Sequence, residues 1–133
     1  MKVTINASVI VKWFIPDNEN HTDSALALFK KVEEGTLTVV QPLHWQAEVI
    51  AVLTRLRPEI VDKSIVLLDA LELPVIDNIQ VYQQASQLSQ VLNHHLFDTL
   101  YHAVAIAANG NFMTDDRKYY NKAKGTGNIE LLA

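Results

Sequence analysis

The stretch LFDTLYHAVAIAANGNFMTDD, residues 96–116, decides the fold of this 133-residue chain. Its first part, residues 96–108, is apolar on nearly every side, and a helix of this kind lies deep in a protein core. Asn109 and Gly110 end the helix, a strand is predicted at residues 111–114, and two aspartates follow. A buried helix that leads into a short strand indicates an α/β sheet covered by helices.

Short apolar strands and amphipathic helices alternate along the rest of the chain. Strands are predicted at residues 2–5, 36–40 and 129–132, with a weaker candidate at 74–76. Helices are predicted at residues 8–14, 22–34, 44–57, 60–71, 80–93 and 117–123, and a loop at residues 16–18. Ser8 and Thr22 are the expected N-caps of the first two helices. This order predicts a single domain, residues 1–133, folded as a three-layer α/β/α sandwich with a mostly parallel central sheet of four to five strands.

Composition excludes several classes of protein. The chain has no cysteine, so it has neither disulfides nor thiolate metal sites, and a reducing cytosol suits it; we expect a cytoplasmic protein. No apolar stretch approaches the roughly 20 residues that a membrane span needs, and the N-terminus is predicted to be a strand entering a helix, not a signal peptide. The net charge of −4 argues against broad attraction to nucleic acid. It does not exclude a nuclease, because a bound divalent metal supplies positive charge for the phosphate.

Polar side chains follow the first strand and the late strand of the predicted sheet. In parallel sheets ligands bind at the carboxyl ends of strands. That rule selects Asn6 and Ser8 after the first strand, and Asp115 and Asp116 after the late one. The alternative is ordinary turn and cap chemistry, which these residue types also favour.

Two further acids stand on apolar helices. Asp98 lies in the first turn of the core helix, and a carboxylate is costly to bury there unless it is paired or bound to metal. Its alternative role is to stabilise the helix N-terminus. Glu48 lies within WQAEVIAVL, and glutamate is almost never fully buried without a partner. Its alternative place is a narrow exposed face with Arg55 and Arg57.

Histidine–carboxylate pairs and one basic stretch add weaker signals. His44 and Glu48, and likewise Asp98 and His102, are spaced i, i+4, so each pair shares a helix face and has a spacing that can bind transition metals. In the simpler interpretation, one of these two histidines caps a helix and the other packs in the core. A further option is that His102 hydrogen-bonds a metal ligand without touching the metal. One basic-aromatic stretch could contact phosphates and stack on a base, and its alternative is a solvated helix face. It contains Arg117, Lys118, Tyr119, Tyr120, Lys122 and Lys124.

Four segments, in order, resemble the PIN-domain family, specifically the VapC-type toxins of bacterial toxin–antitoxin pairs. INASVIVKWF resembles the family's hydrophobic-Asp-Ala-Ser-Val start, and PLHWQAEVIAVL is similar to its Pro-Leu segment leading to Glu-Val. LFDTLYHAVAIAANG resembles the segment in which Tyr-Asp-Ala precedes a run of Ala and Leu, and FMTDDRKYY resembles its Thr-Ala-Asp segment. The resemblance covers essentially the whole chain.

The resemblance implies an endoribonuclease that cuts RNA with water activated by Mg²⁺ or Mn²⁺. The catalytic and metal-binding positions carried over are Asn6, Glu48, Asp98 and Asp116, with Ser8 and Thr114 hydrogen-bonding nearby carboxylates or phosphate and Asp115 in the place of the usual alanine. Arg117 and Lys118 are the candidate RNA contacts from the basic stretch. The implied partners are a small antitoxin and a second copy of the chain, with apolar surface around Trp13, Phe14 and Trp45 as a candidate contact area whose alternative is burial in the core.

Asn6 departs from the family, which has aspartate at this position. A neutral amide removes one negative charge from the cluster, so we expect weakened metal binding and an attenuated or inactive site. A non-catalytic PIN-like domain that binds RNA or protein is the first alternative. A receiver-type signalling domain is disfavoured because no middle strand ends in aspartate, and the four glycines form neither a dinucleotide-binding nor a P-loop pattern.

Overall fold

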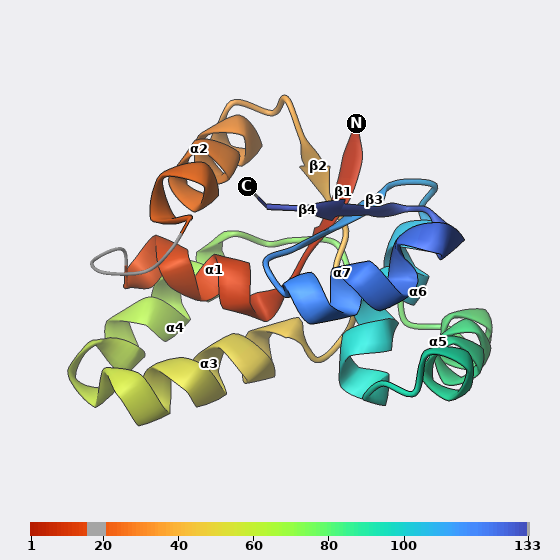
Figure 1. Ribbon diagram of the computed structural model, residues 1–133. Coiled ribbons are helices and arrows are strands. Elements are labelled where there is room, and N and C mark those ends of the chain that lie inside the picture. Colours follow the sequence, from red (N-terminus) through yellow and green to blue (C-terminus); the bar gives the residue numbers. More distant parts are fainter. Residues whose placement is uncertain (16–20, 133) are drawn as a thin grey trace.

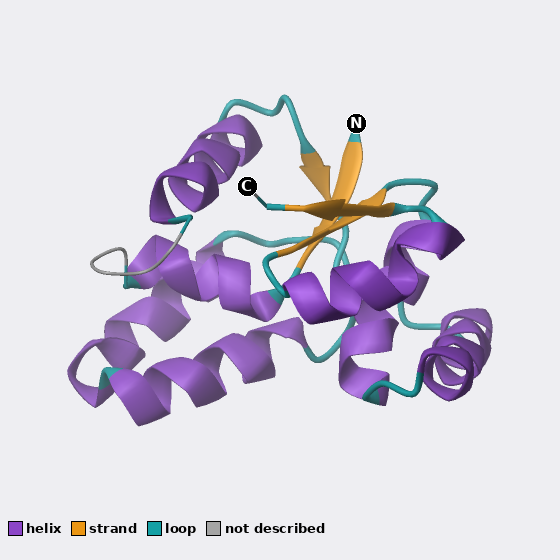
Figure 2. Cartoon of the chain, in the orientation of Figure 1, coloured by secondary structure: helices purple, strands orange, loops and turns teal. Residues whose placement is uncertain are grey.

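A four-stranded parallel sheet forms the centre of the molecule (Figures 1 and 2). The computed structural model describes residues 1–15 and 21–132, so the loop predicted at residues 16–18 lies outside the described residues. The strands are β1 (Lys2–Ile5), β2 (Thr38–Val39), β3 (Asn111–Thr114) and β4 (Ile129–Leu131), in the order β2-β1-β3-β4. All three pairings are parallel, with Val3 opposite Val39 and Thr4 opposite Phe112. The predicted fold class is confirmed.

The helices agree with the sequence pattern, and the differences are at their ends. They are α1 (Ala7–Phe14), α2 (Thr22–Glu33), α3 (Trp45–Leu56), α4 (Val61–Ala70), α5 (Ile79–Leu92), α6 (Leu96–Ala107) and α7 (Arg117–Ala123), with 3₁₀ turns at η1 (Pro58–Ile60) and η2 (Lys124–Thr126). Asn6, not Ser8, is the N-cap of α1, and α2 begins after His21 without a side-chain cap, so both predicted caps were wrong. The weak strand candidate at 74–76 forms a single bridge between Gln41 and Val75.

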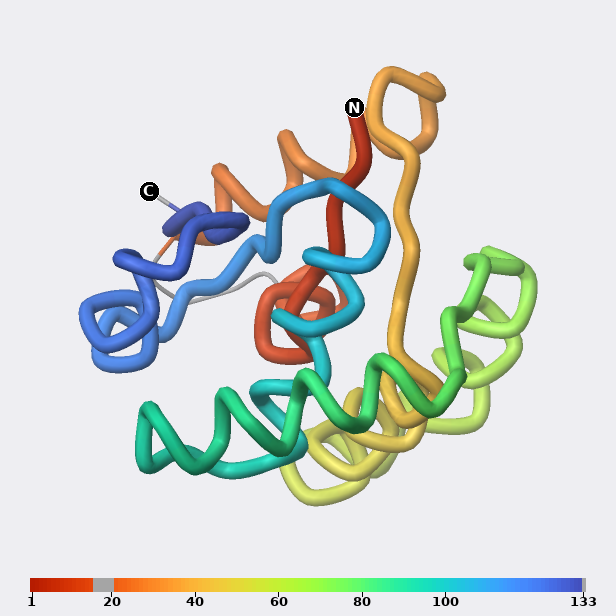
Figure 3. The backbone as a smooth tube through the Cα atoms, turned by 90° about the vertical axis from the view of Figure 1, so that its right-hand side faces the viewer, coloured from red at the N-terminus to blue at the C-terminus, as the bar shows by residue number. Residues whose placement is uncertain are grey.

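Helices cover both faces of the sheet because side chains alternate along each strand. On one face, Val3 and Met113 line a cavity with Leu28 of α2. On the other face, the ring of Phe112 stacks on Tyr101 of α6 at 5.7 Å and lies 5.9 Å from Tyr119 of α7. Helices α3, α4 and α5 gather at the end of the sheet where β1 leads into α1 (Figures 1 and 3).

The junction between α6 and β3 requires glycine. Gly110 lies against the backbone of β1, and a Cβ at this position would be 2.4 Å from the carbonyl oxygen of Lys2. The core helix α6 is buried from Thr99 to Ala105, as its sequence predicts. Within the described residues, no helix has the length and apolar character that a membrane crossing requires.

The predicted core position of His102 is confirmed, and it makes stability depend on pH. The Nε2–H group of His102 donates to the carbonyl of Gly127 at 2.8 Å, so Nδ1 accepts from the Tyr119 hydroxyl at 2.8 Å. Burial lowers the pKa of His102, an effect that the Gly127 carbonyl only partly offsets. The folded state therefore binds fewer protons than the unfolded chain, whose histidines titrate near ~6.5.

We expect the folded state to lose stability as the pH falls below about 6.5, by ~1.4 kcal/mol for each pKa unit of depression at His102. The free energy of unfolding in urea, measured between pH 8 and pH 5, checks this expectation. His102→Gln should be less stable at pH 8 and should lose less stability on acidification. Parallel pH profiles for the two proteins would contradict the assignment to His102.

Candidate active site

The candidate residues gather at the carboxyl ends of β1 and β3, which are neighbours in the sheet. The chain runs from β1 outward to β2 and then returns past β1 to β3, so the strand order reverses between these two strands. Such a switch point leaves a crevice at the sheet edge where ligands bind. The backbone N–H of Asn6 donates to the Met113 carbonyl at 3.0 Å, which joins the two strand ends.

The side chain of Asn6 is held at both of its polar atoms. Its Oδ1 accepts from the N–H of Ser8 at 3.3 Å as the cap of α1, and its Nδ2 donates to Oγ1 of Thr114 at 3.2 Å. Thr114 is fully buried, and its Oγ1 also accepts from the N–H of Asp116 at 3.0 Å. Thr114 thus connects Asn6 to the Asp116 backbone; no hydrogen bond from this hydroxyl to a carboxylate is seen among the described residues.

Asp116 and Asp98 meet at the start of two helices, together with a histidine that the sequence analysis did not select. One ligand atom from each of His94, Asp98 and Asp116 lies within 4.8 Å of the others. Nε2 of His94 is 2.7 Å from Oδ2 of Asp98, and Oδ1 of Asp116 accepts from the N–H of Tyr119 at 3.0 Å. His94 is four residues before Asp98, but it precedes α6, so a search for pairs on one helix face passes over it.

Glu48 lies outside this group and is held by a different set of contacts. The Tyr101 hydroxyl donates to Oε1 of Glu48 at 2.6 Å, and Nε2 of His44 is 3.2 Å from the same oxygen. Burial raises the pKa of the Glu48 carboxyl, but the hydrogen bonds from His44 and Tyr101 outweigh it and bring the pKa below its usual value. His44 occupies the N-cap position of α3, but its side chain makes no capping hydrogen bond, and its Nε2 also lies 2.9 Å from the Phe97 carbonyl.

The hydroxyl of Tyr101 is expected to control the ionisation of Glu48. Tyr101→Phe removes the donor and keeps the ring in the core, so the pKa of Glu48 should rise toward or above its usual value. Carbon-13 NMR of the Glu48 carboxyl across a pH titration checks this. Tyr120→Phe serves as the control, and an unchanged Glu48 titration in Tyr101→Phe would contradict the prediction.

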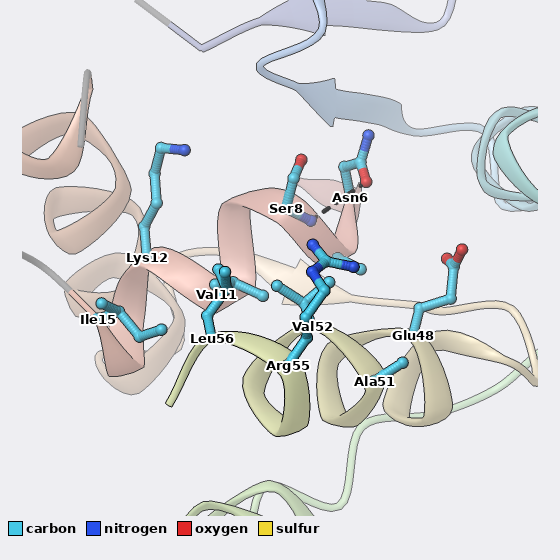
Figure 4. Close-up of a pocket in the computed structure, with 11 residues that line it drawn as sticks. Asn6, Ser8, Val11, Lys12, Ile15, Glu48, Ala51, Val52, Arg55 and Leu56 are labelled. Atoms are coloured by element: carbon cyan, nitrogen blue, oxygen red, sulfur yellow. Dashed lines mark hydrogen bonds between the residues drawn. The ribbon is translucent and has the colours of Figure 1, made fainter. Parts of the chain in front are cut away.

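A cavity of about 450 Å³ lies between α1 and α3 beside Asn6 and Glu48. Figure 4 shows Glu48 and Arg55 rising from α3 toward the start of α1, where Asn6 and Ser8 stand. The far part of the cavity is apolar and is lined by Val11, Ile15, Val52 and Leu56. The cavity therefore combines a polar end next to the candidate site with an apolar groove.

Asp115 has a structural partner that local sequence did not indicate. Its Oδ2 is 2.8 Å from Nζ of Lys12, and its Oδ1 accepts from the hydroxyl of Ser8 at 2.5 Å. The side chains of Lys12 and Asp115 are only 9% and 14% exposed. Through these two contacts Asp115 links the end of β3 to α1. Ser8 hydrogen-bonds a carboxylate, as the family resemblance implied, and that carboxylate belongs to Asp115.

The basic stretch on α7 divides between core and surface. Tyr119 is 1% exposed, so it is unavailable to stack on a base, contrary to one interpretation of the sequence. Arg117 and Lys118 are exposed. Lys118 and Lys122 line a cavity of about 500 Å³ with His94 and His95, next to the histidine–aspartate group.

The aromatic residues proposed as a contact surface are largely internal. Trp45 is 2% exposed and belongs to the core. Trp13 and Phe14 are partly buried against that core, and Nε1 of Trp13 donates to the Ala25 carbonyl at 2.8 Å. The expectation of an exposed patch at Trp45 was therefore wrong, and its alternative, burial in the core, holds.

The fold and the strand-end site are those of an α/β sheet protein with acids gathered at the switch point. Comparison with known families gives a match to the PIN domain over residues 3–125. The chain belongs to the PIN-domain family, which confirms the resemblance seen in the sequence. PIN domains are generally nucleases and typically use divalent metals.

Solved structures share this fold at low sequence identity. A crystal structure of VapBC2 from Rickettsia felis bound to a promoter DNA fragment matches with a TM-score of 0.70 and 16% identity, covering 100% of both chains. VapBC-1 from nontypeable Haemophilus influenzae matches with a TM-score of 0.66 and 14% identity, over 99% of this chain and 98% of that one. A toxin–antitoxin complex from Klebsiella pneumoniae has a TM-score of 0.66 and 13% identity, over 96% and 95% of the two chains. No curated protein sequence matches this chain.

Proposed function

We propose that this chain is a metal-dependent endoribonuclease, the toxin of a toxin–antitoxin pair, and that Asn6 attenuates it. The observation that carries the proposal is the approach of Asp98 and Asp116 at the switch point of a PIN-domain sheet. Carboxylates placed this way are suited to a hard divalent cation such as Mg²⁺ or Mn²⁺.

The residues present fit such a cation, because Asp98 and Asp116 both have carboxylate oxygens in the group and both are partly exposed. Asp98 and Asp116 would hold it. When bound, the cation supplies a water of lowered pKa and charge that neutralises the phosphate. Glu48, whose pKa is lowered, stays ionised at neutral pH and can accept a hydrogen bond from water that approaches the scissile phosphate.

Asn6 weakens this arrangement in two ways. Its amide has no charge, and both of its polar atoms already bond within the protein, Oδ1 to Ser8 and Nδ2 to Thr114. The neutral, internally bonded Asn6 side chain also favours a second candidate function, a PIN domain that binds RNA or a protein without cutting. Restoring a carboxylate at position 6 distinguishes the nuclease from the binding domain.

Partners follow from the surface chemistry. RNA would contact the exposed Arg117 and Lys118, which follow Asp116 directly. An antitoxin segment with apolar and acidic side chains suits the groove of Val11, Ile15, Val52 and Leu56, which has the exposed Arg55 along it. A second copy of the chain suits the exposed apolar side chains of α4, namely Ile65, Val66 and Leu67, at 37%, 68% and 52% exposed.

The test is metal-dependent cleavage of a pool of structured RNAs, with a DNA pool of matched sequence in parallel. The chain and its Asn6→Asp form are assayed with Mg²⁺ and with Mn²⁺. Cleavage of RNA by the Asp form, stopped by a chelator and lost in Asp98→Ala, supports a ribonuclease disarmed at one position. If neither folded form cuts any RNA, the nuclease proposal fails and the binding domain replaces it.

A further inference from the structure

His94 stands in the candidate metal group as a nitrogen donor beside two carboxylates. Its Nε2 faces Asp98 at 2.7 Å, and its side chain is only 10% exposed. The four positions that resemble the family's acidic site do not include this residue. This chain has Asn6 in place of the family's first aspartate, so a carboxylate is missing directly after β1, while a nitrogen donor lies next to Asp98 and Asp116.

The His94 side chain is positioned before any ligand arrives. Its backbone N–H donates to the Ser89 carbonyl at 3.1 Å, and its carbonyl accepts from the Ser89 hydroxyl at 2.5 Å. Asn93 before it adopts the left-handed conformation, with φ of 50°, which turns the chain from α5 into α6. The His94 ring lies edge-on to Tyr119 at 4.6 Å between centroids. A donor fixed in this way loses little conformational freedom on binding a metal.

We propose that His94 is a direct metal ligand, so that the centre of this chain is a set of one histidine and two aspartates selective for Mn²⁺ or another first-row transition ion over Mg²⁺. This inference rests on the proposed function. Mg²⁺ binds oxygen and retains its waters, whereas imidazole nitrogen raises affinity for transition ions. A neutral imidazole also adds a donor without restoring the charge missing at Asn6.

Lys122 lies against the His94 ring in a way that opposes metal binding by that ring. Its Nζ is 3.4 Å from Nδ1 of His94 and 3.1 Å from the Asn93 carbonyl. When Nε2 binds a metal, Nδ1 carries the ring proton, and the lysine must move away from it. Lys122 is exposed on α7, so its ammonium group can move away from Nδ1 into solvent. The alternative role of His94 is to orient Asp98 by a hydrogen bond alone.

Metal affinity separates these two roles, and a matched control is available in His95, the exposed neighbour that is no member of the group. Binding of Mn²⁺ and of Mg²⁺ is measured by titration calorimetry for the chain, His94→Ala and His95→Ala. We expect His94→Ala to weaken Mn²⁺ binding on the order of tenfold or more and Mg²⁺ binding less than about threefold. His95→Ala should leave both affinities nearly unchanged. Pulsed electron paramagnetic resonance of bound Mn²⁺ should show coupling to a nitrogen nucleus that is lost only in His94→Ala.

Two results would overturn the inference. One is absence of nitrogen coupling in the Mn²⁺-loaded chain, and the other is an equal loss of Mn²⁺ and Mg²⁺ affinity in His94→Ala. If Asp98→Ala abolishes binding in either case, the metal site of the proposed function survives and only the role of His94 fails. If the chain and its Asn6→Asp form bind no metal at all, the proposed function fails together with the inference.

Discussion

Replacing Asn6 by aspartate is expected to raise the rate of metal-dependent RNA cleavage on the order of a hundredfold or more. A carboxylate at position 6 would add a negative charge at the carboxyl end of β1, beside the end of β3 that carries Asp116. Several kcal/mol of transition-state stabilisation is a reasonable contribution for a charged group in a metal site, and each ~1.4 kcal/mol is about tenfold in rate.

We expect the fold to tolerate this change. Aspartate is as good an N-cap as asparagine, and its charge is favourable at the start of α1. One carboxylate oxygen can keep the bond from the N–H of Ser8. The other carboxylate oxygen would face Oγ1 of Thr114. The Thr114 hydroxyl can donate to that oxygen, and this bond replaces the present one, in which Nδ2 of Asn6 donates to Thr114.

Asn78→Asp is the matched control, because Asn78 caps α5 by accepting from the N–H of Val81 and is no member of the group. It makes the same chemical change at another helix N-terminus. Single-turnover cleavage rates with saturating Mn²⁺ are compared for the chain and both variants. A rise in Asn78→Asp equal to that in Asn6→Asp would show that added charge, not the site, is responsible. No rise in a folded Asn6→Asp protein would contradict the prediction.

Replacing Asp115 by alanine, the residue usual in the family, is expected to destabilise this protein by about 3 kcal/mol. The change removes the carboxylate from a lysine whose side chain is 9% exposed, and it also removes the acceptor of the Ser8 hydroxyl. A lysine this deeply buried that loses a charged acceptor retains the cost of its desolvation while it loses part of the compensation. For a chain of this length we expect the melting temperature to fall by roughly 10 °C.

The double variant Lys12→Met, Asp115→Ala tests the cause. Methionine fills a similar volume without charge, so the double variant should recover much of the stability lost in Asp115→Ala. Urea unfolding of the chain, both single variants and the double variant gives the coupling energy of the pair. If the stability lost by the double variant, relative to the unchanged chain, equals the sum of the losses of the two single variants, the two side chains do not act together.

Local sequence determined the elements of this fold. The apolar surface of residues 96–108 defined the core helix, and Asn109–Gly110 defined its end, because periodicity and turn chemistry are encoded within a few residues. The rule that ligands bind at the carboxyl ends of parallel strands then placed Asn6 and Asp116 at the same edge of the sheet. The caps were less predictable, since Asn6 and Ser8 are both capping residues and only the chain direction after β1 selects between them.

Tertiary structure decided which side chains meet at that edge. Asp115 pairs with Lys12 across 103 residues, and Glu48 bonds Tyr101 across 53, and no periodicity relates positions so far apart. His94 joins Asp98 and Asp116 because the left-handed turn at Asn93 aims it back over the start of α6. The sequence by itself determined the family and the elements, and it selected the candidate acids. The packing of α1, α6 and α7 around the ends of β1 and β3 determined the partner of each acid. Such contacts join side chains of separate elements, so they depend on the relative positions of those elements in the folded chain.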